Sequence, residues 1–237
     1  MTTKEFKRED GRKLDETREI KAEVGIIPNA DGSAMFAFGD TIAIAAVYGP
    51  RQMYPQHQKN PEKSVLRCNY SMLSFSVNDR IRPGPNRRSM EISKITEWAL
   101  EPVLMIEQFP NMVIDVYIAI LQANASTRCA GINAAAMALA HAGIPMKDLV
   151  SSVSIGKLDK HLVVDLNKKE EDYEEGEGAT DMPFAFFSNE DKITLMQLDG
   201  NISTKQYKEA IELAKKACKK IYEVQKEALK KTIGEGD

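Results

Sequence analysis

The sequence has few cysteines and histidines and lacks a long apolar run. The three cysteines of this 237-residue chain, Cys68, Cys129 and Cys218, lie far apart, which predicts reduced thiols in a cytoplasmic protein. The three histidines have no metal-ligand spacing, which argues against a zinc site. Because no segment has the length and apolar character of a bilayer span or a signal peptide, we expect no membrane contact.

The sequence also lacks an excess of charge of one sign. It has 32 basic and 35 acidic residues, a net charge of −3, which argues against a protein that coats nucleic acid over its whole surface. A Walker-type glycine loop is missing as well, which disfavours a nucleotide triphosphatase. Any site for an anionic partner must therefore be a local cluster of basic residues.

Hydrophobic periodicity predicts strands and helices in mixed order. We expect strands at 34–38, 41–48, 66–77, 112–121, 150–158, 162–166, 184–187 and 193–198, with the 112–121 strand buried on both faces. We expect helices at 86–108, at 127–142 and after a capping box formed by Ser203 and Gln206, and an exposed loop at 50–63. This pattern predicts an α+β fold of sheets and helices in layers. No linker divides the chain, so we expect a single domain over residues 1–237.

The first candidate site is the start of the alanine-rich helix, where Ser126, Thr127 and Arg128 follow a predicted strand. The free N–H groups of a first helical turn attract anions, and the planar guanidinium of arginine matches phosphate. A simpler interpretation is that Ser126 or Thr127 caps the helix and Arg128 is solvated.

The second candidate is a basic cluster ahead of the 86–108 helix. Arg80, Arg82, Arg87 and Arg88 occur within nine residues. Cations at a helix N-terminus oppose the helix dipole, so Arg87 and Arg88 do nothing for the helix itself. They indicate an anionic partner, although a solvated basic loop is an equally simple interpretation.

The third candidate is Asp181, which follows an acidic stretch and precedes an apolar strand. Most acids of that stretch are expected to form a solvated loop. A carboxylate at the edge of a strand is a candidate general acid or metal ligand. Spacing alone does not select Asp181 among its acidic neighbours.

Five motifs in this order resemble the RNase PH family. They are REDGRKLDETR at 8–18, GSAMFAFGDT at 32–41, NRRSMEIS at 86–93, QANASTRCA at 122–130 and TDMP at 180–183. The resemblance covers nearly the whole chain. Within the family, the 51–67 region and the Asp-Met-Pro ending are most similar to the catalytic subunits of archaeal exosomes.

The resemblance implies the RNase PH fold, which is related to a domain of ribosomal protein S5. It implies a phosphate-dependent 3′→5′ exoribonuclease that releases nucleoside diphosphates and that can also run in reverse to add tails. It further implies partners: the 3′ end of single-stranded RNA, a related non-catalytic subunit that completes a hexameric ring, and RNA-binding cap subunits.

The resemblance also implies roles for individual residues. Inorganic phosphate, the co-substrate, would bind at Ser126, Thr127 and Arg128. Asp181 would be the catalytic carboxylate and a possible Mg²⁺ ligand, with Glu175 as a second acidic residue of uncertain role. RNA would be bound by Arg67, Arg80, Arg82, Arg87 and Arg88. The family's phosphate loop commonly reads Asp-Gly followed by glycine or serine, whereas here it reads Asn124-Ala125-Ser126. Ala125 in place of glycine narrows the backbone angles open to the loop.

Two alternatives stay open at this stage. A bacterial-type RNase PH would trim tRNA 3′ ends as a homo-oligomer and would work alone, whereas an exosome subunit would need its partner. A non-catalytic ring subunit would only bind RNA, but such a scaffold has no need of Asp181 or of the Ser126–Arg128 motif.

Overall fold

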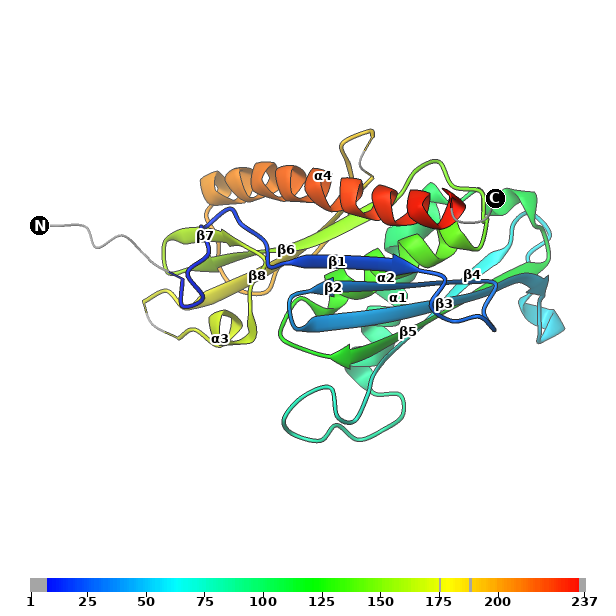
Figure 1. The fold of residues 1–237 in the computed structure, drawn as a ribbon, viewed down its shortest axis with the longest axis horizontal. Coiled ribbons are helices and arrows are strands. Elements are labelled where there is room, and N and C mark those ends of the chain that lie inside the picture. The colour runs from blue at the N-terminus through cyan, green and yellow to red at the C-terminus, as the bar shows by residue number, and fades with distance from the viewer. Residues whose placement is uncertain (1–7, 175, 188, 235–237) are drawn as a thin grey trace, which may run out of the picture.

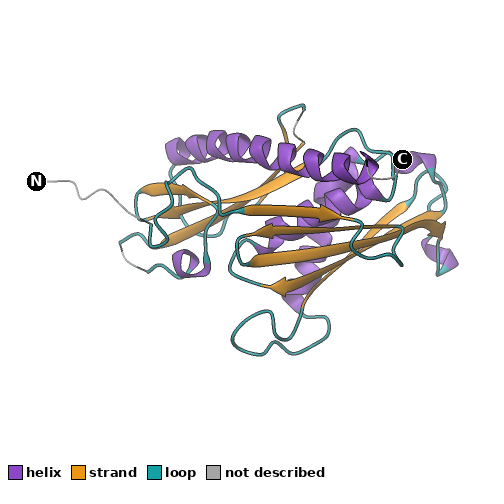
Figure 2. Ribbon diagram, in the orientation of Figure 1, coloured by secondary structure: helices purple, strands orange, loops and turns teal. Residues whose placement is uncertain are grey.

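Two β-sheets enclose an alanine-rich helix in this computed structural model, which describes residues 8–174, 176–187 and 189–234 (Figures 1 and 2). The first sheet has the order β1-β2-β3-β5-β4. Its strands are β1 (Ile20–Val24), β2 (Gly32–Phe38), β3 (Thr41–Gln52), β4 (Val65–Met72) and β5 (Met112–Gln122). Only β4 and β5 pair in parallel among its neighbouring strands.

The second sheet is antiparallel and has the order β7-β6-β8-β9. Its strands are β6 (Val150–Leu158), β7 (His161–Val164), β8 (Ala179–Phe187) and β9 (Lys192–Met196). The helices are α1 (Arg87–Leu100), α2 (Thr127–His141), α3 (Lys168–Glu171) and α4 (Thr204–Gly234). Helix α4 runs along both sheets and contacts β1, β6 and β7 (Figure 1).

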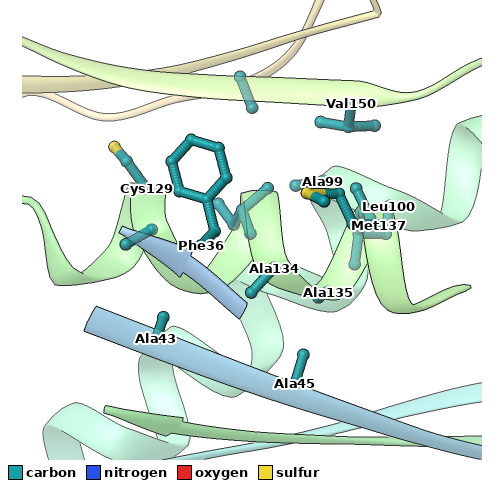
Figure 3. Close-up of a cluster of buried hydrophobic side chains, with 14 of the residues drawn as sticks. Phe36, Ala43, Ala45, Ala99, Leu100, Cys129, Ala134, Ala135, Met137 and Val150 are labelled. Atoms are coloured by element: carbon teal, nitrogen blue, oxygen red, sulfur yellow. The ribbon is translucent and has the colours of Figure 1, made fainter. Parts of the chain in front are cut away.

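Helix α2 is buried on all sides because it lies between the two sheets. Figure 3 shows Ala43 and Ala45 of the first sheet on one side of it and Val150 of β6 on the other. Every residue from Cys129 to Leu139 is buried. The small alanine side chains allow both sheets to approach the helix closely, as the alanine-rich sequence predicts. One continuous cluster of buried side chains includes residues of both sheets.

The mixed α+β architecture confirms the predicted fold class. The predicted strands and helices are present, but several boundaries were wrong. Strand β3 continues to Gln52 into the predicted loop, and β4 already ends at Met72. The predicted 86–108 helix ends at Leu100, and Pro102 lies in the following short 3₁₀ helix Glu101–Val103. Strand β5 was expected to be buried on both faces, yet its outer face exposes Tyr117.

Candidate active site

A cleft of about 620 Å³ opens between the two sheets at the N-terminal end of α2. It is lined by side chains that are far apart in the sequence. Five of the predicted site residues meet there: Arg88, Ser126, Thr127, Arg128 and Asp181. The prediction that these residues form one site therefore agrees with the geometry, whereas their individual roles stay predictions.

The turn before α2 has an unusual backbone. Ala125 and Ser126 both have positive φ angles, 56° and 54°. The simpler interpretation allowed the Ser126 side chain to cap the helix, but it does not. Its hydroxyl instead donates to Asp165 Oδ1 at 3.0 Å and to the Leu166 carbonyl at 3.2 Å. The first-turn N–H groups of α2 consequently have no side-chain cap and remain available to an anion.

Arg128 extends from the first turn of α2 into the cleft. Its Nη1 donates to the Gln197 side chain, and its Nη2 lies 3.9 Å from Glu91 Oε1. Its Nε–H is buried and has no acceptor among the described residues. Gln197 also donates to Glu91, at 3.4 Å, so these two residues hold the guanidinium in place. A buried N–H without a partner is costly.

Asp181 lies within β8, rather than just before the strand as the sequence suggested. The Ser154 hydroxyl on the neighbouring strand β6 donates to its Oδ1. On its other side, the backbone of Asp181 pairs with that of Asp199 through two hydrogen bonds of 2.9 Å. The neighbouring strand β6 on one side and the chain after β9 on the other therefore fix Asp181 at the cleft.

The pKa of Asp181 is raised above its usual value of 3.8. Burial is the main cause, and the nearby carboxylates of Glu171 and Asp199 act in the same direction. The hydrogen bond from Ser154 and the charge of Arg128 oppose the increase. A carboxyl group with a raised pKa retains its proton to higher pH, which suits a general acid.

The other predicted arginines lie outside the cleft lining. Arg80 and Arg82 are exposed on the 73–86 loop, which projects from the molecule in Figure 1, and Arg87 is exposed at the start of α1. Asn86 caps α1 through a capping box with Ser89. Arg67 lies on the outer face of the first sheet, where its Nε pairs with Asp115 Oδ1 at 2.6 Å. Glu175 lies outside the described residues.

The cleft also contains residues that the sequence did not single out. Gln197 and Ser154 lie in no motif that would mark them, and Glu91 lies in the NRRSMEIS motif without having been selected as a site residue. Asp199 and Glu171 contribute carboxylates, and Lys168 contributes an amine. Lys168 and Glu171 belong to the stretch expected to be a solvated loop, and only the folding of α3 against the cleft brings them to the site.

The comparisons with known proteins agree with this geometry. A family model described as "3' exoribonuclease family, domain 1" matches residues 16–145, and one described as "3' exoribonuclease family, domain 2" matches residues 148–217. The cleft between the two sheets thus belongs to a protein of the 3′ exoribonuclease class. The chain is a member of the RNase PH family of 3′ exoribonucleases.

Individual relatives place the chain more narrowly. The exosome complex component Rrp41 of Thermococcus kodakarensis is 51% identical over 224 residues, which cover 94% of this chain and 88% of that protein. The exosome complex component Rrp41 of Methanopyrus kandleri is 48% identical over 225 residues, with 95% and 92% covered. These relatives are the type of protein that the sequence resemblance predicted.

Two solved structures share the fold. Rice Rrp46 superposes with a TM-score of 0.83 at 26% identity and covers 94% of this chain and 100% of that one. A chain of the Archaeoglobus fulgidus exosome with RNA bound to the active site superposes with a TM-score of 0.77 at 22% identity, with 92% of each chain covered.

In the described residues, no helix is long and apolar enough to cross a membrane.

Proposed function

We propose that this chain is the catalytic subunit of an archaeal-type exosome ring and that it degrades RNA from the 3′ end by phosphorolysis. The observation that carries the proposal is the meeting of Arg128, the uncapped start of α2 and Asp181 in one cleft. The first two supply donors for a phosphate, and the third supplies a carboxyl group with a raised pKa. Family membership and the identity to archaeal exosome components support the same activity.

The reaction begins with inorganic phosphate at the start of α2. One phosphate oxygen attacks the phosphorus of the last phosphodiester bond of the RNA. A new P–O bond forms, and the bond from that phosphorus to the 3′ oxygen of the preceding nucleotide breaks. Protonated Asp181 gives its proton to the leaving 3′ oxygen and regains one from solvent. The products are a nucleoside 5′-diphosphate and an RNA that is one nucleotide shorter.

Repulsion between two anions is the main obstacle to this reaction. Arg128 and the dipole of α2 neutralise the attacking phosphate, and Arg88 lies in the same cleft to neutralise the RNA phosphate. Holding both groups in line contributes up to about 7–11 kcal/mol in favourable cases. Because a phosphodiester is exchanged for a diphosphate linkage of similar energy, the reaction is reversible, and excess nucleoside diphosphate drives tail addition.

Mg²⁺ is a separate question. The described residues contain no group of three or more His, Cys, Asp or Glu side chains that could hold a metal ion. Mg²⁺ in phosphoryl-transfer sites is commonly held by one or two carboxylates together with substrate phosphates and water. Asp181 offers one such carboxylate, but no step of the proposed reaction depends on a metal ion.

The proposal includes the partners of an exosome ring. A related non-catalytic RNase PH-type subunit would complete a hexamer in the cytoplasm, and RNA-binding cap subunits would deliver single-stranded RNA. The exposed Arg80, Arg82 and Arg87 would contact the RNA backbone on its way to the cleft. Such contacts to phosphate carry no information about the base sequence. Arg67 would contribute only if RNA also reached the outer face of the first sheet.

RNA digestion with and without inorganic phosphate tests the proposal. The chain is assayed alone and together with the RNase PH-type partner subunit, and the products are identified by chromatography. We expect nucleoside diphosphates, only when phosphate is present and mainly when the partner is present. Full activity of the chain alone would instead indicate a homo-oligomeric RNase PH, and RNA binding without degradation would indicate a non-catalytic subunit.

A further inference from the structure

The turn that precedes α2 is held in a conformation that its own residues disfavour. Ala125 and Ser126 are consecutive, both have a Cβ atom, and both have left-handed backbone angles. L-residues other than glycine rarely adopt this conformation, and it persists only where the surroundings fix it. Something outside the turn must therefore hold it.

Thr41, the first residue of β3, is one anchor of the turn. Its fully buried hydroxyl accepts from the Asn124 N–H at 3.0 Å and donates to the Ala125 carbonyl at 2.8 Å. Arg18 is the second anchor, since its Nη1 donates to the Asn124 carbonyl at 2.5 Å. Three backbone polar groups of Asn124 and Ala125 are thus bound by residues that are 83 or more positions away.

Asp165 is the third anchor, and Arg18 orients it. Asp165 is fully buried, and Arg18 binds it through Nε at 2.8 Å and Nη2 at 2.6 Å in a two-pronged ion pair. The same carboxylate accepts from the Ser126 hydroxyl at 3.0 Å. Carboxylate and carbonyl oxygens only accept, so the single hydroxyl proton of Ser126 is directed to Asp165 or Leu166 and away from the cleft.

Asp165 also connects the turn to Asp181, the proposed catalytic carboxylate. The Asp165 N–H donates to the Ser154 carbonyl at 2.8 Å, and the Ser154 hydroxyl donates to Asp181. Asp165 therefore links the two halves of the cleft, the phosphate turn and the strand that carries the acid. This link is formed entirely by buried or partly buried groups, which limits the relative movement of the two halves.

We propose that Arg18, Thr41 and Asp165 are positioning residues that hold the turn in its left-handed conformation so that the N–H groups of α2 and Arg128 converge on phosphate. In this proposal the Ser126 hydroxyl belongs to the holding network and does not contact the phosphate. The inference rests on the proposed function for its substrate, but the holding of the turn can be measured independently of activity.

Thr41→Val tests the proposal because valine keeps the shape of threonine and removes both of its hydrogen bonds to the turn. We expect the KM for phosphate to rise by about tenfold, which corresponds to the loss of one or two hydrogen bonds. The kcat at saturating phosphate and the affinity for RNA should stay unchanged, because neither Asp181 nor the exposed arginines move. A general loss of structure would change all three together.

A second substitution distinguishes positioning from simple destabilisation. Glycine adopts left-handed angles without a steric penalty, so adding Ala125→Gly to Thr41→Val should lower the phosphate KM again. Thr96→Val is the matched control, because Thr96 is also fully buried but its hydroxyl only donates to Ile92 within α1. The control should leave the phosphate KM unchanged.

Hydrogen exchange of the Asn124 amide provides the readout that needs no activity. Its N–H donates to Thr41 Oγ1, so Thr41→Val should accelerate its exchange, and Thr96→Val should not. Unchanged exchange or an unchanged phosphate KM in Thr41→Val would overturn the inference, as would a double variant with no recovery. If the wild-type protein degraded no RNA in the presence of phosphate, the proposed function would fail, and the exchange measurement would still decide whether the turn is held in this way.

Discussion

Arg128 is the side chain of the cleft whose proposed role depends most on its shape. Its planar guanidinium is held by Gln197 and Glu91, and its buried Nε–H has no acceptor among the described residues. A lysine would keep the positive charge but would lose the fixed fork of donors. We therefore expect Arg128 to act in the proposed reaction through its geometry as well as its charge.

The first prediction is that Arg128→Lys raises the KM for phosphate by roughly tenfold or more, because at least one charge-assisted hydrogen bond is lost. Affinity for RNA should change little. Steady-state kinetics at varied phosphate concentration measure the effect. Arg67→Lys is the matched control, since Arg67 forms its two-pronged pair with Asp115 on the outer face. A normal phosphate KM in Arg128→Lys would remove Arg128 from the phosphate site.

The second prediction concerns Asp181. Asp181→Asn should leave RNA binding intact and reduce turnover by about 10²-fold or more, which is the typical contribution of a general acid. Gel-shift binding and single-turnover degradation separate these two effects. Wild-type turnover in the variant would exclude the acid role.

The same substitution has a consequence for stability that depends on pH. The pKa of Asp181 is higher in the folded protein than its ordinary value, mainly because of burial, so the folded state binds the proton more tightly. Stability from this group is greatest below pH 3.8 and is lost as pH rises to the folded-state pKa. Above the folded-state pKa, where the wild-type carboxylate has lost its proton, Asp181→Asn should therefore have the higher Tm in thermal unfolding. The difference should shrink as the pH is lowered toward 3.8, and a variant whose Tm relative to wild type does not rise with pH would contradict this reasoning.

At the scale of the elements, the contact between β2 and α2 determines how closely the first sheet and the central helix can pack. A Cβ atom added at Gly32 would lie 2.4 Å from both the Ala138 carbonyl oxygen and the Ala142 nitrogen. These are backbone atoms of the helix end and cannot move aside without displacing it. Gly32 is thus required by close approach and not by its backbone angles.

The third prediction is that Gly32→Ala lowers the free energy of unfolding by about 1–3 kcal/mol or more, as overpacked cores do. Urea denaturation monitored by circular dichroism measures the change. Glu23→Ala, at an exposed position of the neighbouring strand β1, should alter stability by less than about 0.5 kcal/mol. Equal stability of the Gly32→Ala variant would show that the helix end can yield.

The sequence predicted the elements well because their signals are local. The alanine-rich run and the Gly143 and Pro145 stop located α2, and an apolar run located β6, each almost to the residue. The capping box at Ser203 marked the start of α4. Boundaries failed where tertiary contacts decide them, as at the end of β3, which continues because β5 pairs with it as far as Gln52.

The site was predictable only in part. The Ser126–Arg128 motif indicated an anion site, and the family resemblance selected Asp181 among many acids. The direction of the Ser126 side chain could not be predicted, because it depends on Asp165, 39 positions away. Gln197 and Ser154 carry no sequence signal, since their contacts to Arg128 and Asp181 arise only when the second sheet forms.

At the scale of the whole molecule, the charges are nearly balanced, but several basic groups concentrate near the cleft. The net charge is −3, whereas Arg80, Arg82 and Arg87 are exposed on one loop and the helix that follows it. RNA binding should therefore depend on a few local contacts and on charges contributed by other ring subunits, rather than on a uniformly basic surface.

The fourth prediction is that Arg87→Ala weakens RNA binding similarly for all sequences and reduces its salt dependence. When the logarithm of the RNA-binding constant is plotted against the logarithm of the salt concentration, loss of one phosphate contact should reduce the magnitude of the slope by about 0.7 for single-stranded RNA. Fluorescence anisotropy at several salt concentrations measures it, with Lys192→Ala on β9 as an exposed control outside the cleft lining. An unchanged slope would place Arg87 outside the RNA path.

The central claim is that free phosphate is the nucleophile, and isotope transfer tests it most directly. RNA is incubated with the complete ring and ³²P-labelled inorganic phosphate, and the released nucleotides are separated. Phosphorolysis predicts that every released nucleotide is a nucleoside diphosphate labelled in its β-phosphate. Unlabelled nucleoside monophosphates, formed at the same rate whether or not phosphate is present, would show instead that water is the nucleophile.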